Sequence, residues 1–151
     1  MPGLPLPSNS RSRTPVCYFL FSAVGEVESL RSAAEAIRFA PSRKVRFSPL
    51  IYFTESPSLD TIQQCANLGF DDVITIPFAP ARLAERISRQ VNTSLVYYET
   101  SSYFGPDRRE RQVLTPPPGE MRAGGRYRRL EIMRSLVSGI SVVRDEFCEV
   151  I

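Results

Sequence analysis

The feature that most constrains the fold is a threefold alternation between short apolar runs and amphipathic segments over about 75 residues. The runs at 16–21, 49–54 and 72–76 are rich in β-branched and aromatic residues, as expected of strands buried on both faces. Each run is followed by apolar residues at three- and four-residue spacing, which predicts an amphipathic helix. Such alternation predicts an α/β fold with a small parallel sheet of about three strands and right-handed crossovers.

Residue chemistry marks where these helices begin and end. The first helix is expected to end near Pro41, because proline cannot continue a helix. Ser56 and Pro57 are suited to the cap and first turn of the second helix, and Gly69 to its end. Pro80 should open the third.

Composition divides the chain into four parts. Residues 1–15 carry four prolines with Ser and Arg and should be disordered, and residues 16–92 should form the α/β domain. Residues 93–125 contain an Arg-rich stretch and a Pro-Pro-Pro-Gly break, which predict a flexible linker. Apolar residues at helical spacing then predict a C-terminal amphipathic helix over 126–148, namely Leu130, Met133, Val137, Ile140 and Val143.

Two absences in the composition narrow the chemistry. The chain has no histidine, which excludes histidine as a general base, phospho-acceptor or metal ligand. Its three cysteines have no CxxC spacing, which favours reduced thiols over disulfides or a zinc site. We therefore expect no metal, no cofactor and no enzymatic activity. No apolar run approaches the roughly 18 residues of a membrane span, so we also expect no membrane association and a cytoplasmic location.

The segment from Pro49 to Ile87 carries motifs in a fixed order. A proline-led strand ends at Thr54, a helix ends in Ala-Asn-Leu-Gly, two aspartates precede the next strand, Ile-Pro-Phe follows it, and Leu83 lies in the last helix. These motifs resemble the second half of a response-regulator receiver domain, a flavodoxin-like fold of bacterial two-component signalling. Extended backward, the resemblance covers residues 16–92 and implies a receiver that lacks its opening strand–helix–strand.

The resemblance also implies that the phosphorylation chemistry is incomplete. A receiver needs a carboxylate nucleophile, two acids that hold Mg²⁺, and a lysine and a switch hydroxyl that contact the phosphoryl group. Thr54 keeps the switch hydroxyl, but Ser22 stands at the nucleophile position and Ile76 at the lysine position. We therefore expect a phosphorylation-incompetent regulatory module that binds a signalling protein. The interaction surface of the family implies Tyr52, Thr54, Ile76 and Phe78 as contacts.

The nearest acids to these positions have structural interpretations. Glu26 and Glu28 suit the first turn of a helix, and Asp71-Asp72 suit a turn before a strand. We prefer these interpretations to metal binding, and a hydrogen-bonded strand-end hydroxyl to a switch for Thr54.

Loss of the opening third would turn the apolar run at 16–21 into a sheet edge. The C-terminal segment, a second copy of the chain or additional upstream sequence could cover that edge. The chain is therefore expected to self-associate through the Val16–Phe21 strand or the C-terminal helix. Upstream sequence would also restore the missing acids, which leaves an active phospho-acceptor as an alternative.

The arginines of the C-terminal third support another alternative. Arginines alternate with Tyr103, Phe104 and Tyr127, and such a cluster could bind cyclic di-GMP or a nucleic acid by charge and stacking. A solvated linker is the simpler interpretation. The candidate phosphate-binding residues are Arg108, Arg109, Arg111, Arg126, Arg128 and Arg129.

Overall fold

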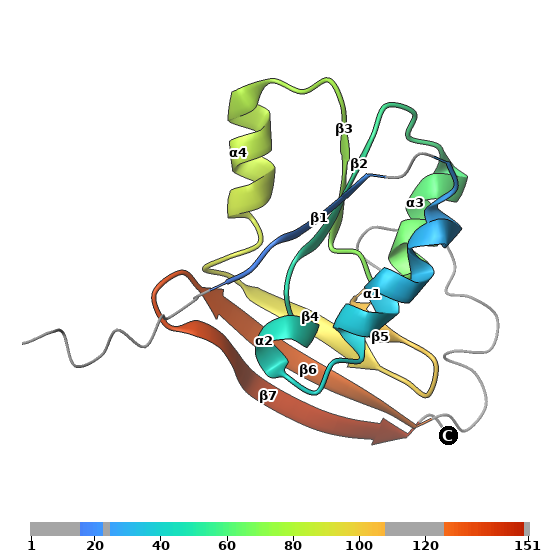
Figure 1. Cartoon of the computed structure of the whole chain (residues 1–151). Helices are drawn as coiled ribbons and strands as arrows, with labels where there is room; N and C mark the ends of the chain where they lie inside the picture. Colours follow the sequence, from blue (N-terminus) through green and yellow to red (C-terminus); the bar gives the residue numbers. More distant parts are fainter. Residues whose placement is uncertain (1–15, 23–24, 108–125, 150–151) are drawn as a thin grey trace, which may run out of the picture.

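The computed structural model describes residues 16–22, 25–107 and 126–149, which form a mixed α/β structure with two sheets (Figure 1). The segment predicted to be disordered, residues 1–15, and residues 108–125 of the predicted linker lie outside the described residues. The parallel sheet stands above the antiparallel one in Figure 1.

The predicted parallel sheet is confirmed. Its strands are β1 (Phe19–Ser22), β2 (Leu50–Thr54) and β3 (Asp72–Thr75), and they pair in the order β1-β2-β3. The helical elements between and after them are η1 (Val27–Leu30), α1 (Arg31–Arg38), α2 (Arg43–Arg46), α3 (Leu59–Asn67) and α4 (Pro80–Ser88). In Figure 1, α1 and α3 lie on one side of the sheet and α4 on the other.

The helix boundaries follow local chemistry, with one correction. Pro80 opens α4 as predicted, and Gly69 follows α3 with a φ of 86°, a conformation that glycine adopts without steric cost. The cap of α3 is Ser58 rather than the predicted Ser56, because the Ser58 hydroxyl accepts the Thr61 N–H at 3.0 Å.

The C-terminal third forms a second sheet, which the sequence interpretation missed. Strands β4 (Ser94–Glu99), β5 (Phe104–Pro106), β6 (Arg126–Ser135) and β7 (Gly139–Glu149) are antiparallel and pair in the order β5-β4-β6-β7. The predicted helix over 126–148 is therefore wrong. Leu130, Ile132 and Arg134 are buried at two-residue spacing, the period of a strand, and Gly139 has a φ of 85° where β7 begins.

The predicted linker over 93–125 is wrong in its described part. Residues 94–99 and 104–106 are strands, and Tyr97, Tyr103 and Phe104 are buried. Aromatic residues favour strands, but the neighbouring glycines, prolines and arginines indicated a linker.

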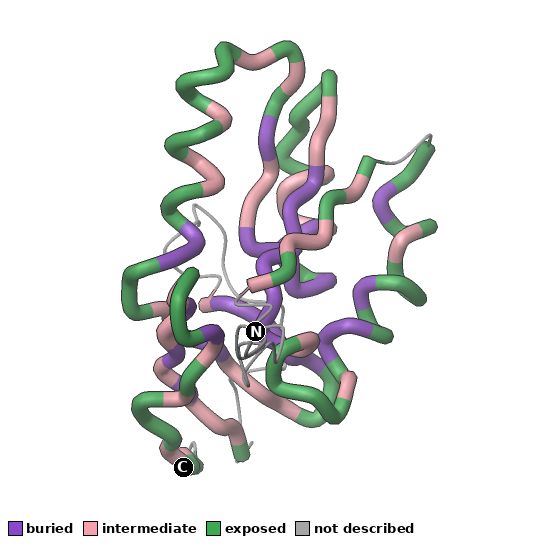
Figure 2. Tube along the Cα trace, turned by 60° about the vertical axis from the view of Figure 1, so that its left-hand side comes forward, coloured by how far each residue is buried: buried purple, intermediate pink, exposed green. Residues whose placement is uncertain are grey.

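Two apolar clusters form the core. One joins the parallel sheet to α1 and α3 and includes Leu50, Tyr52 and Phe70, and the other packs Phe47 against the antiparallel sheet around Tyr97. Helix α4 contains no fully buried residue and is drawn mostly as exposed or intermediate in Figure 2. One wall of the parallel sheet is therefore only lightly covered.

Candidate functional site

The structure brings the three predicted strand-end positions to one edge of the parallel sheet. Ser22 pairs in register with Phe53 at the end of β1, and the Ile76 N–H donates to the Thr54 carbonyl at 2.8 Å. The carboxyl ends of parallel strands are the usual ligand-binding edge of such sheets. At this edge the side chains are two hydroxyls and an alkyl group, so they provide neither a carboxylate nucleophile nor a cation.

The hydroxyl of Thr54 has a structural partner, because it accepts the Ser56 N–H at 3.1 Å. A polar groove of about 310 Å³ opens beside it, with Glu26 and Asp60 among its lining residues. Asp60 accepts a hydrogen bond from Gln64 at 3.0 Å. These contacts agree with the interpretation of Thr54 as a strand-end hydroxyl.

The other acids considered as metal ligands are paired with arginines. Glu28 bonds Arg31, and this hydrogen bond lowers the pKa of the Glu28 carboxyl. Asp72 accepts the Arg86 Nε–H at 2.8 Å. Within the described residues, no group of three or more His, Cys, Asp or Glu side chains is placed to hold a metal ion.

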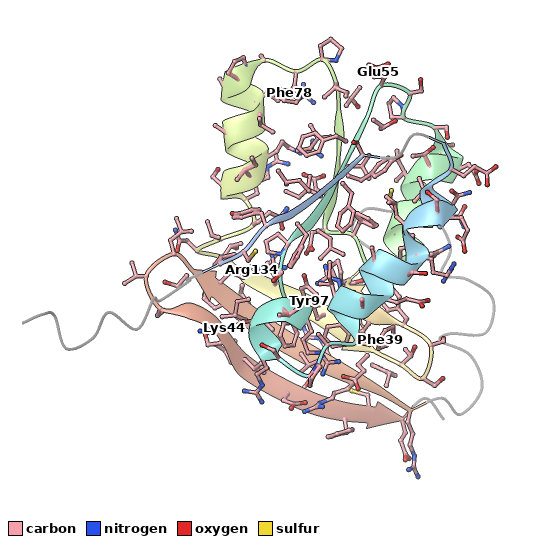
Figure 3. All side chains as sticks on the ribbon, viewed as in Figure 1. Phe39, Lys44, Glu55, Phe78, Tyr97 and Arg134 are labelled. Atoms are coloured by element: carbon pink, nitrogen blue, oxygen red, sulfur yellow. The ribbon has the colours of Figure 1, made fainter. Side chains whose placement is uncertain are left out.

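The predicted interaction surface is divided by the structure. Tyr52 is only 4% exposed and packs in the core, although it lines the polar groove beside Thr54. Thr54 and Ile76 are partly exposed at the strand ends. Phe78 is partly exposed as well, and it lies beside α4 in Figure 3.

Phe78 lines an apolar groove of about 560 Å³ along α4. Leu83 and Ile87 form the helix side of the groove, and Tyr18 forms the sheet side. The Tyr18 hydroxyl donates to the Ile87 carbonyl at 3.0 Å, which ties the start of the β1 segment to the end of α4. Leu136, from the turn between β6 and β7, reaches the same groove.

A buried ionic cluster joins the two sheets, and we call Arg38, Asp71, Tyr97 and Arg134 the clamp. Arg38 donates to one Asp71 carboxylate oxygen at 2.6 Å, and Arg134 donates to the other at 3.0 Å. Both arginine side chains are at most 1% exposed. Figure 3 shows Arg134 and Tyr97 close together between the sheets.

The remaining hydrogen-bonding groups of the clamp are also satisfied. Tyr97 donates its hydroxyl to Asp71 at 2.6 Å and accepts a hydrogen bond from Arg134. Arg38 donates to the Gly69 carbonyl at 2.7 and 2.8 Å, and Arg134 donates to the Phe47 carbonyl at 2.8 Å. Burial raises the pKa of Tyr97 to about 12, so its hydroxyl stays protonated as a donor at neutral pH. The cluster is enclosed, so its role is structural.

Comparisons with known proteins found no relative of this chain. No protein-family model, curated protein or solved structure matches the chain. The receiver resemblance therefore depends on the motifs between Pro49 and Ile87. None of the helices in the described part of the chain is long and apolar enough to cross a membrane.

The candidate phosphate-binding arginines fall into two groups of three. Arg108, Arg109 and Arg111 lie outside the described residues. The other three lie on β6 and are paired with acids of the same hairpin: Arg126 with Glu149 at 2.9 Å, Arg128 with Asp145, and Arg129 with Glu131 at 3.1 Å. A phosphate ligand would have to compete with these carboxylates.

Sequence reasoning missed the clamp entirely. Asp71 was assigned to a turn, and Arg134 lies in the segment that was predicted to be a C-terminal helix. The available signal was the alternation of Leu130, Ile132 and Arg134, which places an arginine on the apolar face of a strand. A charged residue in that position requires a buried partner.

Proposed function

We propose that the chain is a phosphorylation-incompetent, receiver-like regulatory module of a two-component-type pathway. It acts in the cytoplasm by protein–protein contact and not as an enzyme. The observation that carries this proposal is the composition of the strand-end edge, where Ser22 and Ile76 stand at the positions that the resemblance assigns to the phospho-acceptor and the phosphate-contacting lysine. The parallel order β1-β2-β3 agrees with the last three strands of a receiver.

Phosphoryl transfer is not expected here for electrostatic reasons. Transfer of a phosphoryl group develops negative charge that a metal ion and a lysine normally offset. Ile76 cannot form an ion pair, and a serine hydroxyl is a far weaker nucleophile than a carboxylate unless a base activates it. The chain has no histidine, and the hydroxyl of the neighbouring Thr54 is engaged with Ser56.

A contact function is supported by the apolar groove. Phe78, Leu83 and Ile87 are partly exposed along a helix that has no fully buried residue. An apolar groove of this kind, next to a sheet edge, is typical of a protein-interaction surface. The surface that we assign to the partner is therefore this groove, which contains Phe78 but not the largely buried Tyr52.

The alternative of cyclic di-GMP or nucleic-acid binding gains no support from the described residues. The guanidinium groups of Arg126, Arg128 and Arg129 are neutralised within the β6–β7 hairpin.

The experiment that tests the proposal is incubation of the full chain with acetyl phosphate and Mg²⁺, followed by intact-mass measurement. The expected result is an unchanged mass. The Ser22→Ala variant is the matched control, because it removes the only hydroxyl at the predicted acceptor position. A phosphoryl adduct on the wild-type chain, whether a stable ester or a labile acyl phosphate, would overturn the proposal, and loss of a stable adduct in Ser22→Ala would locate it on Ser22.

A further inference from the structure

Strand β1 is an edge of the parallel sheet, and one side of its backbone is unpaired within the described residues. The Phe19 N–H donates to the Pro49 carbonyl at 2.9 Å, so the odd-numbered residues of β1 face β2. Because backbone groups alternate along a strand, the N–H and C=O groups of Tyr18, Leu20 and Ser22 point away from β2. These three residues form a row of outward donors and acceptors centred on Leu20.

The β1 edge is only four residues long, but it has neither the charged side chains nor the proline that usually prevent an edge strand from pairing. The segment 16–22 contains no charged residue and no proline, and Leu20 is 57% exposed. Strand β7 is an edge of the antiparallel sheet. It contains Arg144, Asp145 and Glu146, and its pairing with β6 is irregular at Glu131/Ile132. Charges and irregularities of that kind prevent edge-to-edge association. Among the described residues, β7 is therefore a protected edge, whereas the outer side of β1 is available to a partner strand.

The apolar groove lies on the same face of the sheet as Leu20. Tyr18 lines the groove, and Tyr18 and Leu20 point to the same face because side chains alternate along a strand. Leu83 and Ile87 form the opposite wall. An occupant that pairs with the outer edge of β1 would therefore also reach the open side of the groove.

We propose that this occupant is a second copy of the chain, whose β1 pairs antiparallel with β1 about a two-fold axis at Leu20. Leu20 then lies opposite Leu20 of the second copy, and Tyr18 opposite Ser22, so that every outward N–H of the row meets an outward C=O. This inference rests on the proposed function, since it names the partner of the interaction surface.

Symmetry and charge favour a second copy over an unrelated strand. The outward row is symmetric about Leu20, so the edge is complementary to itself, and the uncharged segment 16–22 introduces no like-charge repulsion. A two-fold axis perpendicular to the sheet keeps both α4 helices on one face. The two Leu20 side chains would then lie between the two grooves. One association would therefore cover both the outer edge of β1 and the apolar groove.

The oligomeric state of the full chain, measured by size-exclusion chromatography with light scattering over a concentration series, tests the proposal. We expect a dimer for the wild type and at least about tenfold weaker association for Leu20→Lys, which sets like charges opposite each other in the seam. Val143→Lys is the matched control, because Val143 is also 57% exposed and lies on β7, an edge strand of the antiparallel sheet, and this variant should remain dimeric.

A crosslink provides the second measurement in case Leu20→Lys fails to fold. In a hydrogen-bonded antiparallel pair the Cα atoms are about 5.5 Å apart, within the range of about 4.4–6.8 Å that a disulfide spans. With Cys17 and Cys148 replaced by serine, Leu20→Cys should therefore give a covalent dimer under mild oxidation, and Val143→Cys should not.

The outcomes separate this inference from the proposed function. A monomeric wild type, a Leu20→Lys variant as dimeric as wild type, or equal crosslinking of the two cysteine variants would overturn the β1 dimer. Each of these results leaves the acetyl phosphate experiment as the test of the regulatory module. A phosphoryl adduct on a dimeric chain would overturn the proposed function alone.

Discussion

Replacing Asp71 by asparagine should destabilise the fold more than any other isosteric change at an acidic residue of the described chain. The carboxylate lies between two fully buried guanidiniums and also accepts the Leu50 N–H at 2.9 Å and the Tyr97 hydroxyl at 2.6 Å. An amide of the same shape removes the charge and turns one acceptor into a donor that faces other donors. Arg38 and Arg134 would then be buried without a counter-charge.

The expected magnitude follows from that loss. Removing one partner of a buried ion pair costs about 3–5 kcal/mol, a large part of the roughly 5–15 kcal/mol that stabilises a typical domain. With a urea dependence of about 1.5–3 kcal/mol per molar, the unfolding midpoint of Asp71→Asn should fall by roughly 1–3 M. Urea titration followed by circular dichroism measures this shift.

The neighbouring residue provides the control. Asp72 pairs with Arg86 at the surface, where the two side chains are 15% and 25% exposed, and Arg86 also donates to the Val73 carbonyl at 3.2 Å. Asp72→Asn should therefore lower the free energy of unfolding by only about 1 kcal/mol. Equal losses for Asp71→Asn and Asp72→Asn would refute the reasoning, because the clamp would then contribute no more than a surface pair.

Three further predictions concern stability. Burial raises the pKa of Tyr97 from its ordinary 10.0 to about 12, so its contribution to stability is fully present below pH 10 and is lost between pH 10 and 12, by up to about 3 kcal/mol. Urea titrations over this pH range should show a clearly smaller fall in stability for Tyr97→Phe than for wild type, and the remaining fall should include that of Tyr18, whose pKa burial also raises. Gly69→Ala should lower the free energy of unfolding by roughly 2–4 kcal/mol, because its Cβ would lie 2.8 Å from a backbone carbonyl oxygen at a φ of 86°. The Cβ of Gly25→Ala would meet no atom within 4 Å, so this control should lower it by only about 1–2 kcal/mol. Thermal melting measures both changes. Ser58→Ala should lower the free energy of unfolding by about 1 kcal/mol, because it removes the side-chain cap on the Thr61 N–H. An unchanged melting temperature would contradict this capping role.

The parallel half of the fold could be predicted because its signals are local. The strands at 19–22, 50–54 and 72–75 each contain a short apolar run, and α1, α3 and α4 follow them with helical periodicity. Pro80 and Gly69 mark helix ends through their own backbone preferences. Each of these signals needs only a few consecutive residues.

The antiparallel half could not be predicted in the same way, because its inward face contains an arginine. Arg134 takes the place that a strand pattern reserves for an apolar residue, and its charge is balanced by Asp71, which is 63 residues away along the chain. Met133, Val137 and Ile140 meanwhile match a helical spacing by coincidence. The clamp could not be predicted for the same reason, since its pairs form only once both sheets are in place.

The candidate site was predicted in part. Ser22, Thr54 and Ile76 do meet at one edge of the sheet, because the carboxyl ends of parallel strands are adjacent. The interaction surface was less predictable, because Tyr52 and Phe78 are both aromatic residues near a strand end. Which of them is buried depends on how α3 and α4 pack, and that is not a local property.

The central claim is that this chain acts through its β1 edge and α4 groove and not through phosphoryl chemistry. Native mass spectrometry of the full chain after treatment with acetyl phosphate and Mg²⁺ tests both parts of the claim in one spectrum. We expect a dimer that carries no phosphoryl group. A monomer, or any species with a labile phosphoryl adduct, would contradict it.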